Sequence, residues 1–284
     1  LHVVTKKGHG LPWAAKDPYT WHGAKPYAVE GSEAKVKKGA PTPPAYTKVV
    51  SDAAIEIAKK DEKVVAITAA MPDGTGLVNF QKVLPKRYFD VGICEQHAVC
   101  FAAALAKSGM HPVAFIYSSF LQRAVDQLMH EISLQDGLPV VLAIDRAGVV
   151  GDDGPTHNGT FDIAYMRAFP HFVLCAPKDQ PEAEEMLSWA VKSRLAVAMR
   201  YPRDNVPASP LAKELKPIEL GKGEILRRGE KVAVLAYGAM VVHAVEAANL
   251  VEKNNGLKIT VANARFAKPF DGELLKDLIN SHDR

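Results

Sequence analysis

Short runs of consecutive apolar residues recur along the chain, and longer stretches with helical periodicity separate them. The runs predict strands at Val64–Thr68, Tyr88–Ile93, Pro112–Tyr117, Pro139–Asp145, Phe172–Ala176 and Ala196–Tyr201. The intervening stretches predict helices at Glu95–Lys107, Ser119–Gln135 and Gln180–Lys192. Because the strands are apolar throughout and do not alternate with polar residues, we expect a sheet buried on both faces. The alternation of strand and helix then predicts a parallel α/β fold.

Two polar, proline-containing stretches, Glu30–Thr47 and Asn205–Pro217, divide the chain. After the second, an apolar run at 231–240, a helix near Val241–Lys253 and an apolar run at 258–266 predict a smaller, incomplete α/β unit. We therefore expect four parts: the tail of a preceding domain with a linker at 1–45, a main domain at 46–205, a linker at 206–219 and a small domain at 220–284.

Composition limits the classes of partner. The 284 residues carry a net charge of +3 with acids and bases interspersed, so no surface for nucleic acid is expected. No apolar run reaches the roughly 18 residues of a membrane span. Cys94, Cys100 and Cys175 are odd in number and lack metal-type spacing, which favours a reduced, cytoplasmic protein. The chain opens without methionine and stops just after a helical pattern, so we expect both ends to be internal boundaries of a longer protein.

Polar side chains gather just after the predicted strands. Because ligands of open parallel sheets bind beyond the carboxyl ends of the strands, these residues are the candidates for a site. They are Met71 and Gly76 in "MPDGTG", Glu95, Tyr117, Phe120, Arg123, Arg146, Asp153, His157 and Arg203.

Each candidate also has a structural interpretation. Glu95 suits the first turn of a helix, where an anion faces the positive end of the dipole, and it equally suits a catalytic carboxylate in a dry corner. "MPDGTG" reads as a turn or as backbone that approaches a ligand. Arg123 lies in an otherwise core-packing helix, where a buried arginine needs an anionic partner. His157, in a long glycine-rich loop, is either a surface histidine or an acid/base.

Several enzyme classes lack their signatures here. The chain has no HExxH, no zinc-type histidine spacing, no GxSxG elbow, no Walker A motif and no dinucleotide fingerprint. The site residues must therefore be interpreted through their combination.

That combination resembles the 1-deoxy-D-xylulose-5-phosphate synthases, a thiamin-diphosphate-dependent family of the transketolase superfamily. The matching segments are "DVGICEQHAV", "IYSSFLQRAVDQ", "DRAGVVGDDGPTHNGTFD", "RYPRDN" and "NARFAKPFD", and the opening "LHVVTKKGHGLPWAAKDPYTWHG" is similar to the end of that family's first domain. The resemblance implies a pyrimidine-type cofactor-binding domain followed by a truncated transketolase C-terminal-like domain. It implies a transferase that decarboxylates pyruvate and transfers the two-carbon unit to D-glyceraldehyde 3-phosphate, for isoprenoid and thiamin biosynthesis.

The resemblance also assigns residues on the cofactor side. Glu95 would contact ring nitrogen N1′ of the aminopyrimidine and promote its imino tautomer. Phe120 would stack on that ring, with Tyr117 nearby. Met71 and Gly76 would line the cofactor as well.

On the substrate side, Arg146 and Arg203 would clamp the acceptor phosphate, and Arg123 would stabilise the intermediate that carries the carboxylate. Asp153 and His157 would handle acceptor hydroxyls or protons, and Tyr117 would also contact substrate. His22 would face the reacting carbons.

The resemblance has limits. Cys94 replaces the family's usual alanine, and the motif that binds Mg²⁺ and the diphosphate is expected in an N-terminal domain outside these 284 residues. Two alternatives stay open: another transketolase-like thiamin enzyme, or a non-catalytic half-protein. A homodimer is implied by resemblance alone.

Overall fold

The computed structural model describes residues 1–18, 20–24, 26–31, 33–36, 42–151, 153–211 and 215–284. The chain divides into two compact units, 1–42 and 43–284, which are described separately. In the first unit, β1 (Tyr27–Glu30) pairs with β2 (Glu33–Val36) as an antiparallel hairpin, and α1 (Pro12–Lys16) precedes it. Residues 37–41 and 212–214 of the two expected linkers lie outside the described residues.

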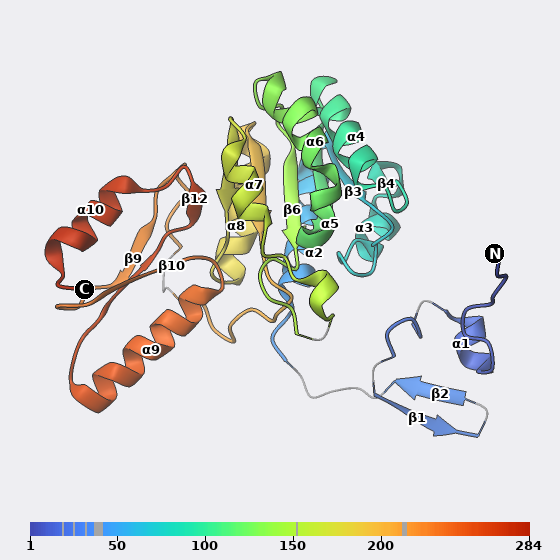
Figure 1. Cartoon of the computed structure of the whole chain (residues 1–284), viewed down its shortest axis with the longest axis horizontal. Helices are drawn as coiled ribbons and strands as arrows, with labels where there is room; N and C mark the ends of the chain where they lie inside the picture. Colours follow the sequence, from blue (N-terminus) through green and yellow to red (C-terminus); the bar gives the residue numbers. More distant parts are fainter. Residues whose placement is uncertain (19, 25, 32, 37–41, 152, 212–214) are drawn as a thin grey trace. The chain divides into compact units, whose positions relative to one another are not determined.

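The second unit is built on a main sheet, whose strands among the described residues run in the order β12-β7-β8-β6-β5-β3-β4 (Figure 1). Its strands are β3 (Val64–Thr68), β4 (Tyr88–Asp90), β5 (His111–Tyr117), β6 (Val141–Asp145), β7 (Phe172–Cys175), β8 (Ala196–Arg200) and β12 (Phe266–Lys268). All pairings are parallel except that of β12 with β7. The expected parallel α/β class is therefore confirmed, with one antiparallel edge strand added.

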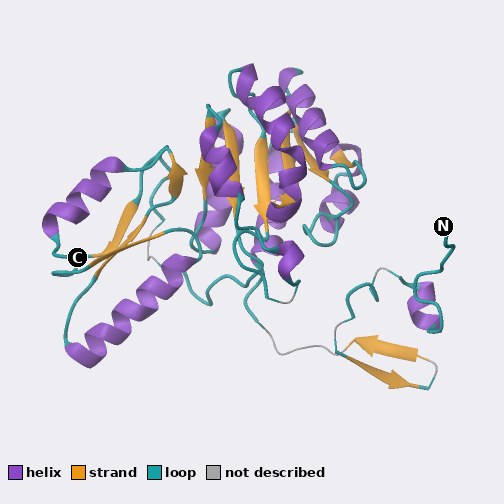
Figure 2. Ribbon diagram, in the orientation of Figure 1, coloured by secondary structure: helices purple, strands orange, loops and turns teal. Residues whose placement is uncertain are grey.

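Helices cover both faces of the main sheet, as Figure 2 shows. In β5, Val113 and Phe115 pack with one apolar cluster, whereas Ala114 and Ile116 pack with the other. One cluster includes α2 (Tyr46–Lys60) and α8 (Gln180–Ser193); the other includes α4 (Glu95–Lys107) and α7 (Asp162–Ala168). Two-sided burial explains why the strand sequences are continuously apolar. A short helix, α3 (Val78–Val83), lies between β3 and β4 along the chain.

The segment after β5 is less regular than the sequence predicts. One helix was expected over Ser119–Gln135, but the chain winds through α5 (Ser118–Leu121), a 3₁₀ turn, α6 (Val125–Gln127), a π-helical turn (Leu128–Ile132) and a second 3₁₀ turn (Ser133–Gln135). The apolar side chains Leu121, Leu128 and Ile132 are all fully buried. Tertiary packing of these residues therefore outweighs the uniform helical periodicity.

A small sheet follows the second linker. Among the described residues, its strands run in the order β10-β11-β9, with β10 (Ala233–Ala236) parallel and β9 (Glu224–Arg227) antiparallel to β11 (Thr260–Asn263). Helices α9 (Met240–Asn255) and α10 (Gly272–Ser281) complete this part of the chain. The apolar run 258–266 does not form one strand, because Arg265 adopts a left-handed backbone (φ 55°) and the chain then joins the main sheet as β12.

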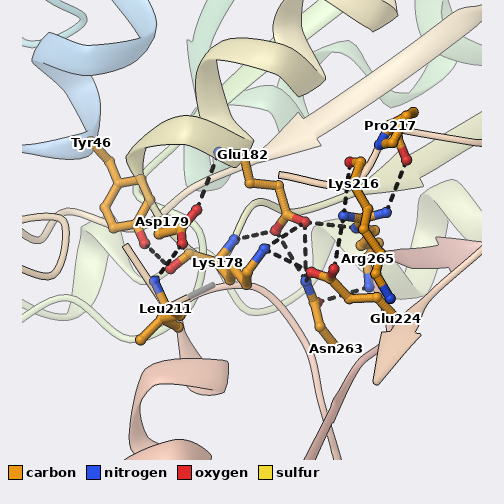
Figure 3. Close-up of polar contacts among 10 residues, drawn as sticks. All are labelled: Tyr46, Lys178, Asp179, Glu182, Leu211, Lys216, Pro217, Glu224, Asn263 and Arg265. Atoms are coloured by element: carbon orange, nitrogen blue, oxygen red, sulfur yellow. Dashed lines mark hydrogen bonds and ion pairs between the residues drawn. The ribbon is translucent and has the colours of Figure 1, made fainter. Parts of the chain in front are cut away.

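A buried cluster of charges joins the small sheet to the main sheet (Figure 3). Glu182, in the first turn of α8, accepts hydrogen bonds from Lys178 Nζ (3.1 Å) and Arg265 Nε (2.7 Å). Glu224, at the start of β9, pairs with Lys178 Nζ (2.7 Å) and Arg265 Nη2 (3.2 Å). Asn263 donates to both carboxylates, so two cations and one amide pair with two buried carboxylates. We call these residues the junction cluster: Lys178, Glu182, Glu224, Asn263 and Arg265.

The junction cluster also holds the linker. Arg265 donates to the carbonyl oxygens of Pro217 and Lys216, each at 3.2 Å. The side chain of Asp179, the N-cap of α8, accepts from the amide of Leu211. Because Arg265 is 2% exposed, its loss would leave two buried carboxylates, Glu182 and Glu224, with Lys178 as their one remaining cation in the junction cluster.

Arg265→Ala is expected to reduce the free energy of unfolding by about 3–5 kcal/mol, since removing one partner strands a buried charge. Urea denaturation measures this change. Arg228→Ala is the matched control, because Arg228 pairs with Asp277 on the surface, with 61% of its side chain exposed. A surface pair contributes less than about 1 kcal/mol. Equal losses in both variants would contradict the assigned role of the junction cluster.

A second buried charge lies at the end of β6. Asp145 is fully buried and accepts hydrogen bonds from Thr47 Oγ1 and from the Arg146 amide, both at 2.7 Å. Burial raises the pKa of Asp145 from its ordinary value of 3.8 to about 6, although Arg146 and Thr47 favour the charged form. The folded state therefore binds a proton here more tightly than the unfolded state does.

The raised pKa of Asp145 makes the stability of the fold depend on pH in a defined direction. Between pH 4 and pH 7 the unfolded chain loses its Asp145 proton first, so the contribution of Asp145 to stability falls by about 2 kcal/mol as the pH rises. Asp145→Asn removes this titration. We expect the stability of the variant, relative to the native chain, to improve by that amount from pH 4 to pH 7 in urea denaturation. A constant difference would show that the pKa of Asp145 is not raised.

Candidate active site

Glu95 begins α4, separated by four residues from the end of β4 at Asp90, and its side chain is only 2% exposed. Oε1 accepts a hydrogen bond from Arg123 Nη1 at 2.8 Å. Oε2 is buried and has no hydrogen-bond partner among the described residues. As the first residue of α4, Glu95 places its carboxylate at the positive end of the helix dipole. A buried oxygen without a donor is rare in proteins, which makes Oε2 a place where a ligand donor fits.

Aromatic rings lie beside this carboxylate. Arg123 lies over the ring of Phe120, with Cζ 5.3 Å from its centroid. Phe120 stacks on Tyr117 with centroids 5.4 Å apart, and His157 meets Phe120 edge-on at 5.1 Å. Burial raises the pKa of Tyr117 further above its ordinary value of 10.0, although Arg146 opposes this, so its phenol stays neutral. Together Tyr117 and Phe120 form a stacked ring pair, with the Arg123 guanidinium and the His157 imidazole beside Phe120.

The arginines of the predicted phosphate clamp share one carboxylate. Asp153 Oδ2 pairs with Arg146 Nε at 3.3 Å, and Asp153 Oδ1 pairs with Arg203 Nη1 at 3.0 Å. Arg146 is 11% exposed, lies over Tyr117 at 4.2 Å, and donates to the carbonyl oxygen of Gly74 at 2.7 Å. Arg203 is 35% exposed. Of the two guanidinium groups, that of Arg203 is the more accessible to an incoming anion.

The segment 71–76 forms a hydrogen-bonded turn and also lies beside Tyr117 of the stacked ring pair. The Thr75 amide donates to the Met71 carbonyl oxygen at 3.0 Å, as a turn requires. A Cβ on Gly74 would lie 2.0 Å from Tyr117 Oη and 2.8 Å from Met71 Cε, so only glycine permits this approach. Gly76, with φ +75°, instead packs against Ser51 of α2. The turn interpretation of "MPDGTG" thus describes its geometry, and the approach of Met71 and Gly76 to a ligand stays a prediction.

Most of the candidate residues form one connected group. Glu95 contacts Arg123, which lies over Phe120 of the stacked ring pair. Tyr117, the other ring, lies under Arg146, which is joined to Arg203 through Asp153. His22 lies in the first unit, where it pairs with Lys7, and its placement relative to this group is not described. The roles assigned to these residues stay predictions.

Sequence reasoning missed several supporting residues. Asp145 and Thr47 anchor the start of the loop that carries Arg146. Gly159 approaches the same backbone so closely that a Cβ would lie 2.3 Å from the Arg146 carbonyl oxygen. Asp145 stands directly before Arg146 at a strand end, which was the available signal. Thr47 is distant in sequence and gave none.

The described residues contain no group of three or more His, Cys, Asp or Glu side chains arranged to hold a metal ion. Within those same residues, no helix has the length and apolar character needed to cross a bilayer.

Comparison with known families gives two matches in this chain. Residues 42–209 match the model of the transketolase pyrimidine-binding domain. Residues 221–284 match the model of the transketolase C-terminal domain. The first match alone covers more than half of the chain.

Curated relatives point the same way. The chain is 50% identical over 283 residues to the 1-deoxy-D-xylulose-5-phosphate synthase of Aquifex aeolicus, covering 100% of this chain and 44% of that protein. It is 53% identical over 277 residues to 1-deoxy-D-xylulose-5-phosphate synthase 2 of Geobacter sulfurreducens, covering 97% of this chain and 44% of the relative. The chain therefore spans less than half the length of these relatives.

Solved structures share the fold. A split-gene transketolase described as an inactive beta4 tetramer is similar with a TM-score of 0.76 and 28% identity, covering 85% of this chain and 78% of that one. A transketolase from Campylobacter jejuni is similar with a TM-score of 0.70 and 20% identity, covering 84% of this chain and 38% of that one. The second likeness supports the fold alone. Taken together, the family models and the relatives show that this chain belongs to the transketolase family and that its sequence is similar to the 1-deoxy-D-xylulose-5-phosphate synthases.

Proposed function

We propose that this chain provides the pyrimidine-binding and acceptor-binding side of a 1-deoxy-D-xylulose-5-phosphate synthase. The reaction would decarboxylate pyruvate and transfer its two-carbon unit to D-glyceraldehyde 3-phosphate. The observation that carries the proposal is the buried carboxylate of Glu95, with one oxygen paired to Arg123 and the other without a partner among the described residues. Mg²⁺, a homodimer and a cytoplasmic location belong to the same proposal.

The residues present fit thiamin diphosphate. Glu95 Oε2 would hold the proton of a pyrimidine ring nitrogen, and the Phe120 ring beside it would stack on the pyrimidine. Arg123 would keep Glu95 oriented through Oε1, which leaves Oε2 for the cofactor. When bound, thiamin diphosphate supplies the electron sink for the loss of CO₂ from pyruvate.

The acceptor would bind at the arginine side of the group. Arg203 would contact the phosphate, because its guanidinium is the more exposed of the pair that shares Asp153. Arg146 would mainly hold Asp153 and the 71–76 turn, since it is buried and bonded to both. His157, against Phe120 and Tyr117, would exchange a proton with the acceptor oxygen.

The first test mixes purified protein carrying this sequence with thiamin diphosphate, Mg²⁺, carbon-labelled pyruvate and D-glyceraldehyde 3-phosphate, followed by NMR. Labelled deoxyxylulose phosphate and CO₂ are expected. Glu95→Gln should lower kcat by about 100-fold or more, since general acid–base groups contribute 10²–10⁴-fold. Product formed from a ketose phosphate but not from pyruvate would instead identify a transketolase-like reaction.

A second readout examines the acceptor site. Arg203→Met should lower kcat/KM for D-glyceraldehyde 3-phosphate by roughly 10- to 100-fold, because a hydrogen bond to a charged group contributes about 1.5–3 kcal/mol. The same variant should change kcat/KM for unphosphorylated D-glyceraldehyde by less than about threefold, since that acceptor has no phosphate. Arg228→Met, on the surface of the small domain, is the matched control. Equal losses for both acceptors would exclude a phosphate contact at Arg203.

One finding favours a second candidate, a half-protein that works with a companion chain. The similar split-gene transketolase is covered over 78% of its length and is described as inactive in its beta4 form. In that case the protein alone would give no product in the first test. Activity that appears on adding a separate diphosphate-binding chain would identify this arrangement.

A further inference from the structure

A buried ion pair below the arginine side of the site has no part in the chemistry proposed above. Asp162, at the start of α7, is 1% exposed, and Arg200, the last residue of β8, is 9% exposed. Arg200 Nε donates to Asp162 Oδ2 at 2.6 Å, and Nη2 donates to Oδ1 at 2.9 Å. This is the two-pronged geometry in which a planar guanidinium fixes both the distance and the orientation of a carboxylate.

The pair joins the bases of the two segments that carry the proposed acceptor site. Asp162 ends the loop 146–161, which carries Asp153 and His157, and Arg200 stands three positions before Arg203. The same two segments meet again through the Asp153–Arg203 pair and through the Ala147 amide, which donates to the Tyr201 carbonyl oxygen at 3.0 Å. The two segments are thus joined by the buried Asp162–Arg200 pair, by a backbone hydrogen bond and by the more exposed Asp153–Arg203 pair.

The loop itself is closed at its neck. The Gly148 amide donates to the Gly159 carbonyl oxygen, and the Gly159 amide donates to the Gly148 carbonyl oxygen, both at 2.8 Å. Asn158 adds a side-chain bond to the Val150 amide at 2.7 Å. These bonds tie the two ends of the loop together, so the position of the loop neck relative to β8 depends on how those ends are held. Asp145 and Thr47 hold one end, and Asp162 with Arg200 holds the other.

A contribution to stability alone does not account well for such a pair. Buried ion pairs are often no more stabilising than apolar side chains of the same volume, because both charges lose their water. Burial opposes the charge on Arg200, yet its hydrogen bonds and attraction to Asp162 raise its pKa overall. The pair is therefore held charged, and a charged bidentate contact provides a fixed geometry that apolar packing does not.

We propose that Arg200 is a positioning residue, which through its bidentate contact with Asp162 fixes the loop bearing Asp153 and His157 relative to the strand end bearing Arg203. This proposal rests on the proposed function for its catalytic meaning. The acceptor pocket would be preformed by this contact, and loosening it would weaken acceptor binding before it affected the cofactor side. The surrounding protein reinforces the contact, since the ring of Tyr237 lies 6.0 Å from the Arg200 guanidinium carbon.

The first experiment needs neither cofactor nor substrate. Hydrogen–deuterium exchange is measured on the native protein, Arg200→Lys and Asp162→Asn, which keep the size of the pair but lose its two-pronged contact. The Ala147 amide bonds the Tyr201 carbonyl oxygen across the two segments, and its exchange is expected to rise at least about tenfold in both variants, with exchange in β5 unchanged. Arg265→Lys is the matched control, because it weakens an equally buried ion pair in the junction cluster. Unchanged exchange at Ala147, or the same rise in Arg265→Lys, overturns the proposal.

The second experiment measures how loss of the bidentate contact changes the KM values of the two substrates. Arg200→Lys should raise the KM for D-glyceraldehyde 3-phosphate about tenfold or more, as expected when a positioning contact shifts a binding group. The KM for pyruvate should stay within about twofold, because Glu95 and Arg123 lie on other segments. A parallel loss for both substrates overturns the positioning role. If the native protein forms no deoxyxylulose phosphate, either alone or with a separate diphosphate-binding chain, the proposed function fails, while the exchange experiment still decides whether the Asp162–Arg200 pair positions the loop.

Discussion

The loss of water from charged groups at the carboxyl edge of the main sheet is the constraint that organises this protein. Both faces of the sheet are covered, so charged side chains emerge only where strands end, and several of them are buried there. A buried charge without a partner is strongly unfavourable. Each one is accordingly paired: Asp145 with Arg146, Asp162 with Arg200, and Asp153 with two arginines. The paired charges connect loops that are far apart in sequence, and the candidate site is the surface that these loops form.

Glu95 is the informative departure from that pattern. One of its oxygens is paired and the other is buried without a partner among the described residues. Where every neighbouring carboxylate has its hydrogen bonds satisfied, a half-satisfied carboxylate indicates a place for a ligand. Exposure separates Arg146 from Arg203: both pair with Asp153, but the Arg146 side chain is 11% exposed and that of Arg203 is 35% exposed.

The sequence predicted the regular part of the fold well, because apolar runs and helical periodicity are local. The strand Val64–Thr68 and the helix Glu95–Lys107 appear with the predicted bounds. The broken winding after Ser118 could not be predicted, since it depends on packing against distant strands. The candidate residues were found from motifs and strand ends. Their supports, Thr47, Asp162 and Arg200, were not, because pairing across some 40 to 100 positions leaves no mark in a single sequence.

The strand β12 gives the C-terminal part of the chain a structural role in the main sheet. It follows the small sheet in sequence, yet it covers the edge of β7 in the main sheet. A chain that ended at the second linker would leave the backbone amide and carbonyl groups of β7 open along that edge. Open edges invite pairing with other chains. Strand β12 therefore covers this edge of the larger sheet, so a segment of the C-terminal matched domain completes the sheet of the pyrimidine-binding domain.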